Sequence, residues 1–302
     1  MISDTIPMQP AEQHGRPSTL YRICRKMWHL KMGVMGGIIL AVMLVCAVAA
    51  PLIAPHDPYA QDIMQRLLPP SFMENGSDRH LLGTDSVGRD TLSRIIYGTR
   101  VSLIVGLSAV CIQLSIGVIL GLMAGYFGGR TDSVISFMVN VMMGFPFILF
   151  AISLVAVIGP SLQNIIFALG VTGWPVFTRV TRVETIKLKE SEFVLCARTL
   201  AFSTKRILLV HILPNLLPAI LVLGTVEVAR AIIRESLLSF LGLGIQPPTP
   251  SWGMMLAEGR DYMLGEWWLA AFPGFAIFLS ALGINLLGDA LRDLLDPHMR
   301  KD

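Results

Sequence analysis

Hydrophobic and polar residues follow one another along this chain in long blocks rather than in the short periods of a soluble fold. Charged side chains are bunched, and the stretches between the bunches carry no charge and are rich in Leu, Ile, Val, Ala and Gly. Uncharged apolar runs of about 18 residues or more are typical of transmembrane helices. The uncharged runs here cover residues 33–53, 101–126, 133–158, 159–178, 212–226, 236–257 and 267–288.

We expect six transmembrane helices from this pattern, and therefore an all-α integral membrane protein. The run at 212–226 is too short to cross a bilayer, so the fifth helix must continue into charged residues. A proline inside an apolar run removes a backbone hydrogen bond and predicts a kink. The expected spans are 33–53, 101–126, 133–158, 161–178, 212–233 and 267–288, and the prolines inside them are Pro146, Pro175 and Pro273.

The apolar run at 236–257 is a different case, because glycine and proline interrupt it repeatedly. Backbone that is broken so often leaves amide groups without partners, and such groups are not tolerated against lipid. We therefore expect residues 236–266 to form a re-entrant or surface segment on the side of the membrane opposite to the termini.

Six spans place both termini on one side of the membrane, and positive charge indicates which side. Two thirds of the 24 lysines and arginines fall on that side, mostly in the leader 1–32, the loop 179–215 and the tail 291–302. Cytoplasmic loops carry an excess of Lys and Arg, so we expect these segments to be cytoplasmic and residues 54–100 to be periplasmic. The leader and the first apolar run are both too long for a cleaved signal peptide, which makes 33–53 an uncleaved span.

Composition excludes several classes of protein. Charged residues make up 15% of the chain, against about 25% in a soluble domain, and the net charge of +3 is too small to indicate a nucleic-acid partner. The four cysteines have no CxxC spacing and the six histidines are not clustered in the sequence, so we expect neither a metal site nor a cofactor. No lysine follows a glycine, which excludes a P-loop, and nothing in the sequence supports catalysis.

The basic loop 179–215 contains a short segment with the pattern of an amphipathic helix. A serine directly before Glu192 is a candidate N-cap, and Glu192 suits the positive end of a helix dipole. Phe193, Ala197 and Leu200 follow at helical spacing and form one apolar face. The helix is predicted either to lie on lipid or to insert into a groove of a soluble partner, and the pattern alone favours neither.

The same loop resembles the EAA loop of binding-protein-dependent ABC importer permeases. That pattern is Glu-Ala-Ala, three residues, Gly and, further on, Ile-x-Leu-Pro; here Cys196 replaces the first alanine, Ala197 matches the second and Ala201 replaces the glycine. The loop is expected to continue as a second helix that ends before Pro214, since proline disfavours helical backbone in the residue before it. Three further stretches resemble the dipeptide, oligopeptide and nickel subgroup of this family, and they cover residues 82–94, 239–253 and 285–297.

The resemblance extends over about residues 30–299 and is to the "C" permease subunit of dipeptide importers. It implies a type I ABC importer permease fold in the bacterial inner membrane, with residues 101–290 as the permease core. It also implies that the chain is not an enzyme. The implied partners are a homologous permease, two cytoplasmic ATP-binding subunits and a periplasmic solute-binding protein.

The resemblance further implies that residues 192–200 form a coupling helix. This helix would dock into a cleft of the ATPase, with Phe193 and Ala197 at the contact. Alanine at position 201 would cost roughly 1 kcal/mol if the turn after the helix requires a positive φ.

Charged residues inside the fifth span are unusual, since one charge at the bilayer centre costs about 2.5–3.5 kcal/mol. Glu227 and Arg230 are three residues apart and share a helix face, and Arg234 and Glu235 follow one turn later. These residues are predicted either to form a structural ion pair near the outer surface or to line a water-filled translocation path for a zwitterionic substrate. The alternative function, a stand-alone secondary transporter or channel, would need intramembrane carboxylates, for which Glu227 is the candidate.

Two further features leave alternatives open. Residues 90–100 have the pattern of an amphipathic helix on the outer membrane surface, either simply solvated or a docking surface for a binding protein. Gly117, Gly121 and Gly125 allow a close approach of helices, either within the chain or against a second permease.

The expected substrates are di- and oligopeptides, with nickel and glutathione as alternatives that the resemblance leaves open.

Overall fold

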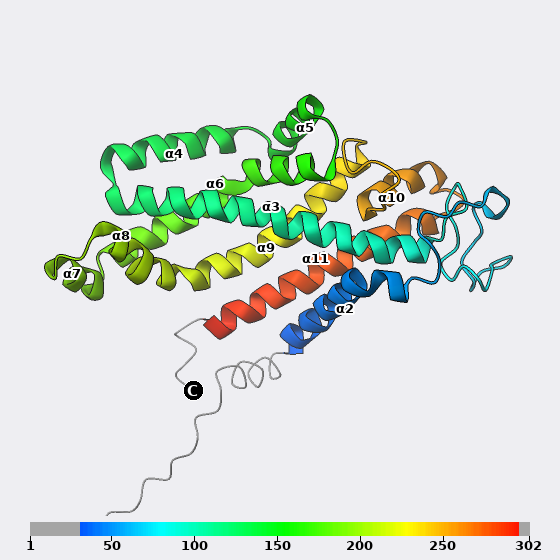
Figure 1. The fold of residues 1–302 in the computed structure, drawn as a ribbon, viewed down its shortest axis with the longest axis horizontal. Helices are drawn as coiled ribbons and strands as arrows, with labels where there is room; N and C mark the ends of the chain where they lie inside the picture. The colour runs from blue at the N-terminus through cyan, green and yellow to red at the C-terminus, as the bar shows by residue number, and fades with distance from the viewer. Residues whose placement is uncertain (1–30, 296–302) are drawn as a thin grey trace, which may run out of the picture.

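The computed structural model describes residues 31–295, and every named element in that range is helical (Figure 1). The longer helices are α2 (Lys31–Ile53), α3 (Thr91–Phe127), α4 (Gly129–Gly144), α5 (Phe147–Ile158), α6 (Leu162–Lys189), α9 (Leu213–Phe240) and α11 (Trp268–Leu295). The shorter ones are η1 (Ile63–Gln65), α7 (Glu192–Thr199), α8 (Thr204–Arg206), the π-helical segment η2 (Ile207–Ile212), α10 (Trp252–Gly259) and η3 (Arg260–Tyr262). The predicted cytoplasmic leader and tail lie mostly outside the described residues.

The long helices pass through the molecule in alternating directions along one axis (Figure 1). Among the described residues, four helices are long and apolar enough to cross a membrane, namely α2, α3, α11 and the continuous helix from Thr204 to Phe240. The bent pair of α4 and α5 meets the same criterion as one pass. The predicted fourth span lies within α6, whose 28 residues run beside α3 and do not meet this criterion.

α3 and α6 approach each other closely through small residues. A Cβ atom at Gly117, Gly121 or Gly125 of α3 would lie less than 3.0 Å from atoms of α6. From the other side, Gly173 of α6 leaves room for the buried side chain of Gln113 on α3. These three glycines of α3 therefore allow close packing of α3 on α6 within the chain, which was the first of the two alternatives.

The third predicted span is two helices rather than one. α4 and α5 meet at an angle of 86° across the break at Phe145 and Pro146. Pro146 has no N–H to donate, and Phe145 before it adopts the extended conformation that a following proline favours. A kink at this proline was predicted, but the prediction of a single kinked helix over 133–158 was wrong. Pro175 and Pro273 lie inside α6 and α11, which continue past them.

α3 is longer than the predicted second span, because residues 91–100 are its first turns. Its 37 residues measure about 55 Å at 1.5 Å per residue. Asp90 caps the helix by accepting a hydrogen bond from the backbone N–H of Ser93 at 2.8 Å. Arg94 in the first turn is only 2% exposed. The structure therefore has a buried start of α3 where a separate surface helix was expected.

The fifth span also differs from its prediction, because the helix does not end before Pro214. Helical backbone continues from Thr204 to Phe240, and η2 lies directly before the proline. The Leu213 N–H donates to the carbonyl of Leu208, five residues back. This wider π-helical turn accommodates a proline that cannot donate a helical hydrogen bond, so α9 follows without a break.

The predicted re-entrant or surface segment at 236–266 is a compact cap on the bundle end away from α7 (Figure 1). Its first residues still belong to α9, and α10 packs against α3, α9 and α11. The Trp252 indole N–H donates to the carbonyl of Ile95 at 2.9 Å, and the absence of a side chain at Gly98 makes room for the ring. This end of α3 is therefore fixed to α10.

Candidate functional site

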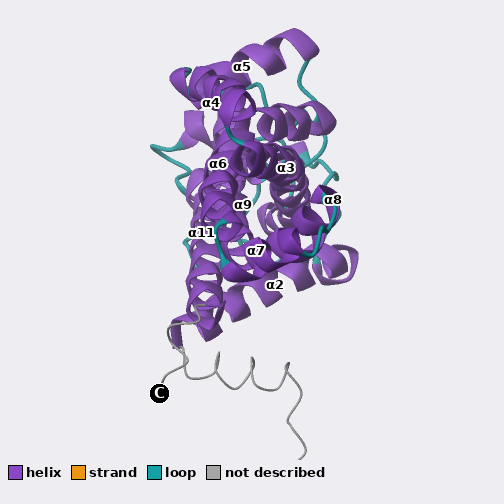
Figure 2. Cartoon of the chain, turned by 90° about the vertical axis from the view of Figure 1, so that its left-hand side faces the viewer, coloured by secondary structure: helices purple, strands orange, loops and turns teal. Residues whose placement is uncertain are grey.

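α7 lies at one end of the bundle, where it connects α6 to the helix that begins at Thr204 (Figure 2). It spans Glu192–Thr199, so the predicted helix forms one residue shorter than expected. The expected N-cap does not form, because the Ser191 hydroxyl donates to the carbonyl of Leu188 at 2.5 Å.

The inner face of α7 anchors it to the rest of the chain. Val194 and Ala197 are 0% and 3% exposed, and they belong to one apolar cluster with the buried isoleucines of η2. The Arg198 guanidinium lies over the ring of Tyr126, near the end of α3, at 5.2 Å. A displacement of α7 would therefore be passed both to α3 and to the helix that contains α9.

The outer face of α7 is open to a partner. Phe193 is 43% exposed, Leu200 just past the helix is 67% exposed, and Cys196 between them is also exposed. Phe193 and Ala197 were predicted to form the contact face together, but Ala197 packs inward. Residues four apart are offset by about 40° around a helix, which turns Ala197 toward Val194.

The turn after α7 requires the backbone conformation that glycine adopts most easily. Ala201 has a φ of +55°, in the left-handed region. Its N–H donates to the carbonyl of Arg198 at 2.9 Å, and the N–H of Phe202 donates to that of Ala197 at 3.1 Å. These two hydrogen bonds form a Schellman motif, in which glycine is the usual residue at the position of Ala201. The condition under which alanine was expected to be costly here, a positive φ after the helix, is therefore met.

Glu227 is fully buried in α9 and forms ion pairs with two arginines. Its Oε1 accepts a hydrogen bond from Arg230 Nη1 at 2.7 Å, and its Oε2 accepts one from Arg234 Nη1 at 3.2 Å. The buried carboxylate is thereby compensated, as its desolvation requires. The Arg230 side chain is 53% exposed, so the cluster presents positive charge on the surface of α9.

Arg234 extends toward the break between α4 and α5. Its guanidinium carbon lies 4.0 Å from the centre of the Phe147 ring. A cavity of about 320 Å³ lies beside Arg234 and is lined mainly by apolar residues of α4, α5, α6 and the break between α4 and α5, including Met142, Phe145 and Phe150. An apolar group joined to a negatively charged one fits these surroundings.

Glu235 does not join the other predicted path residues. It is fully buried, and its Oε1 accepts a hydrogen bond from the Ser239 hydroxyl at 2.7 Å. The structure therefore brings Glu227, Arg230 and Arg234 together and places Glu235 in the interior of the chain.

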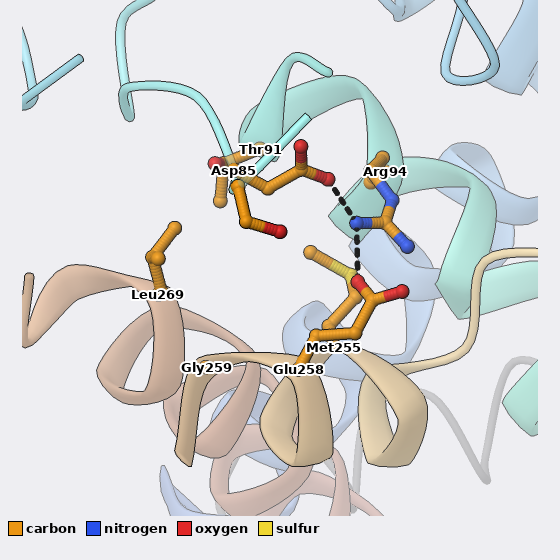
Figure 3. Close-up of a pocket in the computed structure, with 8 residues that line it drawn as sticks. Asp85, Thr91, Arg94, Met255, Glu258, Gly259 and Leu269 are labelled. Carbon is orange, nitrogen blue, oxygen red and sulfur yellow. Dashed lines mark hydrogen bonds and ion pairs between the residues drawn. The ribbon is translucent and has the colours of Figure 1, made fainter. Parts of the chain in front are cut away.

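An ion-pair cluster that sequence reasoning missed connects residues 85–94, before and at the start of α3, to α10 (Figure 3). Arg94 Nη1 contacts the Asp85 carboxylate and lies 2.7 Å from Glu258 Oε2. Arg89 pairs with the same two carboxylates, at 2.6 Å and 3.0 Å. The alternating charges of residues 79–100 were visible in the sequence, but Glu258 is far along the chain and only the fold brings it to them.

The fold also brings His56 and His80 to Asp90, in the segment between α2 and α3. The sequence analysis expected no metal site because the histidines are not clustered along the chain. The fold nevertheless clusters these two histidines, because the loop folds back on the start of α3.

Two family sequence patterns match the chain. The family described as binding-protein-dependent transport system inner membrane component matches residues 117–301. The family described as N-terminal TM domain of oligopeptide transport permease C matches residues 18–70.

Curated relatives match almost the whole chain. The di/tripeptide transport system permease protein DppC of Pseudomonas aeruginosa is 42% identical over 94% of this chain and 94% of its own length. The dipeptide transport system permease protein DppC of Bacillus subtilis is 42% identical over 96% of this chain and 90% of its own. The probable D,D-dipeptide transport system permease protein DdpC of Escherichia coli is 38% identical over 98% of this chain and 97% of its own.

Solved structures with a similar fold include two crystal forms of the MetNI methionine ABC transporter in inward-facing conformations. The matching chains have TM-scores of 0.55 and 0.57 and are 17% identical in sequence. The matches cover 67% and 68% of this chain and 96% and 97% of those chains. The predicted all-α permease fold is therefore confirmed.

Proposed function

The chain belongs to the family of binding-protein-dependent transport system inner membrane components, and we propose that it carries dipeptides and short oligopeptides. It is a transmembrane permease subunit of an ABC importer. The substrate proposal rests on the 42% identity, over nearly the whole chain, to permeases named for dipeptides and tripeptides. The rival function, a stand-alone secondary transporter or channel, has less support, because Glu227 is paired with two arginines instead of being free to bind a proton or cation.

The complete importer in this proposal contains a homologous permease, two cytoplasmic ATP-binding subunits and a periplasmic solute-binding protein. The permease lies in the bacterial inner membrane with α7 and both termini on the cytoplasmic side. The excess of Lys and Arg in the leader and in the loop around α7 supports this orientation. ATP hydrolysis belongs to the partner subunits, since the chain has no P-loop sequence.

α7 acts as the coupling helix in this proposal. The exposed apolar side chains of Phe193, Cys196 and Leu200 would enter a groove of an ATP-binding subunit, which is a common way for a short helix to bind. The inner face of α7 packs on η2, and Arg198 contacts Tyr126 of α3. Closure of the ATP-binding subunits would therefore move both helices and rock them against the partner permease.

The translocation path passes along the surface of α9 where Arg230 is exposed. The guanidinium groups of Arg230 and Arg234 would bind the peptide carboxylate, since charge-assisted hydrogen bonds of this kind are strong and directional. The cavity beside Arg234 would receive an apolar side chain of the peptide. Glu227 would keep both arginines in position in the low dielectric of the membrane.

Uptake by the reconstituted importer tests the substrate proposal. Liposomes that contain the complete importer, with ATP inside and binding protein outside, are supplied with labelled dipeptide, labelled glutathione or Ni²⁺. We expect ATP-dependent uptake of the dipeptide and at least ten times less of the other two. Faster uptake of glutathione or Ni²⁺ than of any dipeptide would show that the substrate proposal is wrong.

A further inference from the structure

We propose that His56, His80 and Asp90 form a binding site for a divalent transition metal ion at the outer end of the permease, with Zn²⁺ as the ion that fits best. The three residues come from separate places in the chain. His56 follows the end of α2, His80 lies in the loop between α2 and α3, and Asp90 is the N-cap of α3. One ligand atom of each lies within 4.8 Å of the others.

The spacing of the ligand atoms is close to that of a tetrahedral site. His80 Nδ1 is 2.9 Å from Asp90 Oδ1, and His56 Nδ1 is 3.7 Å from the same oxygen. Ligands bound at about 2.0–2.1 Å to tetrahedral Zn²⁺ are about 3.3–3.4 Å apart. The separation in each of these two pairs therefore needs to change by about 0.4 Å to bind one ion. Imidazole nitrogens and a carboxylate oxygen are common ligands of Zn²⁺.

The hydrogen bonds around His80 leave the Nδ1 atom of a neutral ring free to bind a cation. Asp62 Oδ2 accepts a hydrogen bond from Gln65 Nε2 at 2.9 Å, which turns Gln65 Oε1 toward the histidine. That oxygen lies 3.1 Å from His80 Nε2, so Nε2 carries the proton that it donates. The lone pair of Nδ1 in a neutral ring then faces the Asp90 carboxylate, and two acceptors at 2.9 Å require a cation or a proton between them. This is the arrangement of a metal-binding histidine whose other nitrogen donates to a neighbouring oxygen.

His56 supplies an independent indication of a ligand. Its Nδ1 atom is buried and has no hydrogen-bond partner. The centre of its ring lies 4.6 Å from that of His80. A buried nitrogen without a partner is unfavourable, and a bound ion would satisfy it. The backbone N–H of His56 donates to the Ser93 hydroxyl at 3.0 Å, which fixes the residue beside the start of α3.

The surroundings leave room for the fourth ligand and favour a cation. A cavity of about 210 Å³ opens beside the three residues, so a water molecule can complete the coordination. The carboxylates of Asp57 and Asp62 line this cavity, together with the guanidinium group of Arg79. A bound ion would join the end of α2 to the start of α3 through the loop between them.

Metal titration of the complete importer tests the site. The complex is purified with an affinity tag that contains no histidine, treated with a chelator and titrated with Co²⁺, whose visible absorption reports tetrahedral nitrogen and oxygen ligands. Zn²⁺ is then added as a competitor. We expect the wild-type complex to bind one more ion per copy of this chain than the His56→Ala complex, or to bind it at least ten times more tightly. Wild-type and His56→Ala complexes with identical titrations would overturn the proposal.

Two further variants separate metal binding from folding. His56 makes no side-chain hydrogen bond among the described residues, so His56→Ala is expected to leave the fold intact and to keep ATP-dependent uptake. His211→Ala is the matched control, because His211 lies on the far end of the bundle and stacks on Phe202 at 5.7 Å. It should bind Co²⁺ as the wild type does; an equal loss of binding in this variant would contradict the assignment. Zn²⁺ should also raise the thermal midpoint of the wild-type complex and not that of His56→Ala.

Discussion

Ala201 determines the energetic cost of the turn that ends α7. Its φ of +55° is unfavourable for any residue with a Cβ atom, yet the two hydrogen bonds of the Schellman motif require it. The strained residue lies in the turn between α7 and the helix that starts at Thr204. Glycine at this position would relieve the strain without changing any side-chain contact of α7.

Replacing Ala201 with glycine should therefore stabilise the protein by about 1 kcal/mol. Denaturant unfolding of the permease in detergent micelles measures the difference. The matched control is Ala197→Gly, four residues earlier in the helical part of α7, which should destabilise by a similar amount because glycine is unfavourable inside a helix. Destabilisation by both substitutions to the same extent would mean that residue 201 is under no backbone strain.

Arg230 is the residue of the charged cluster that is most open to a substrate. Arg230→Ala should lower dipeptide uptake about tenfold, which corresponds to the loss of one charge-assisted contact of about 1.5 kcal/mol. The amount of permease in the membrane should not change, because Glu227 still pairs with Arg234. Uptake is measured in liposomes and normalised to the amount of complex.

Glu227→Ala provides the contrast to Arg230→Ala. It leaves Arg234 without its ion-pair partner in a partly buried position, so less folded permease should be recovered. If Arg230→Ala instead transports at the wild-type rate, the cluster has a structural role and does not contact the peptide.

At the level of elements, the apolar runs predicted α2, α3, α9 and α11 well, because lipid requires long apolar helices. It predicted their ends less well, since the first turns of α3 contain polar residues that only tertiary contacts bury. Arg94 can lie inside the protein because Asp85 and the distant Glu258 neutralise it. The break at Pro146 was predictable as a proline effect, but its angle of 86° depends on how α5 packs on α6.

The candidate site was predicted only in part, because tertiary contacts decide which side chains are buried. Helical periodicity placed an amphipathic helix at Glu192, but it could not decide which neighbouring apolar residues face inward. The decision depends on η2 and the end of α3, against which Val194 and Ala197 are buried. Likewise, nothing along the chain connects His56 to His80, because their meeting depends on the path of a loop without periodic structure.

The α3–α6 contact gives a prediction at the scale of two helices. Gly121→Val should destabilise the permease by about 1–3 kcal/mol or more, since its side chain would overlap the backbone and Thr181 of α6. Gly37→Val on α2 is the control, because a Cβ atom there has no neighbour within 4 Å. Thermal unfolding in detergent should distinguish the two variants. Equal midpoints for both would contradict the close packing of α3 on α6.

The exposed face of α7 gives a second prediction at this scale. Phe193→Asp and Leu200→Asp should each abolish peptide-stimulated ATP hydrolysis by the complete importer, because a charge would enter an apolar groove of the ATP-binding subunit. Leu195→Asp is the control, since Leu195 is 48% exposed but points to a different side of the helix. It should retain most of the activity. Full stimulation in the Phe193 and Leu200 variants would show that this face does not contact the ATPase.

At the scale of the whole molecule, the two ends of the bundle are built differently. The end with α10 is fixed by the buried ion pairs of Arg89 and Arg94 and by the contact between Trp252 and α3. The opposite end carries α7, which is attached to two long helices and exposes an apolar face. In the proposed mechanism, a force applied at α7 would reorient whole helices while the contacts of α10 keep their far ends together.

Uptake with and without the ATP-binding subunits is the most direct test of this mechanism. Liposomes are prepared with both permease subunits and the binding protein, either alone or with the two ATP-binding subunits and internal ATP, and labelled dipeptide is added outside. We expect accumulation of the dipeptide when the ATP-binding subunits and ATP are both present, and none above empty liposomes when either is omitted. Uptake at the full rate by the permeases alone would contradict an ATPase-driven permease.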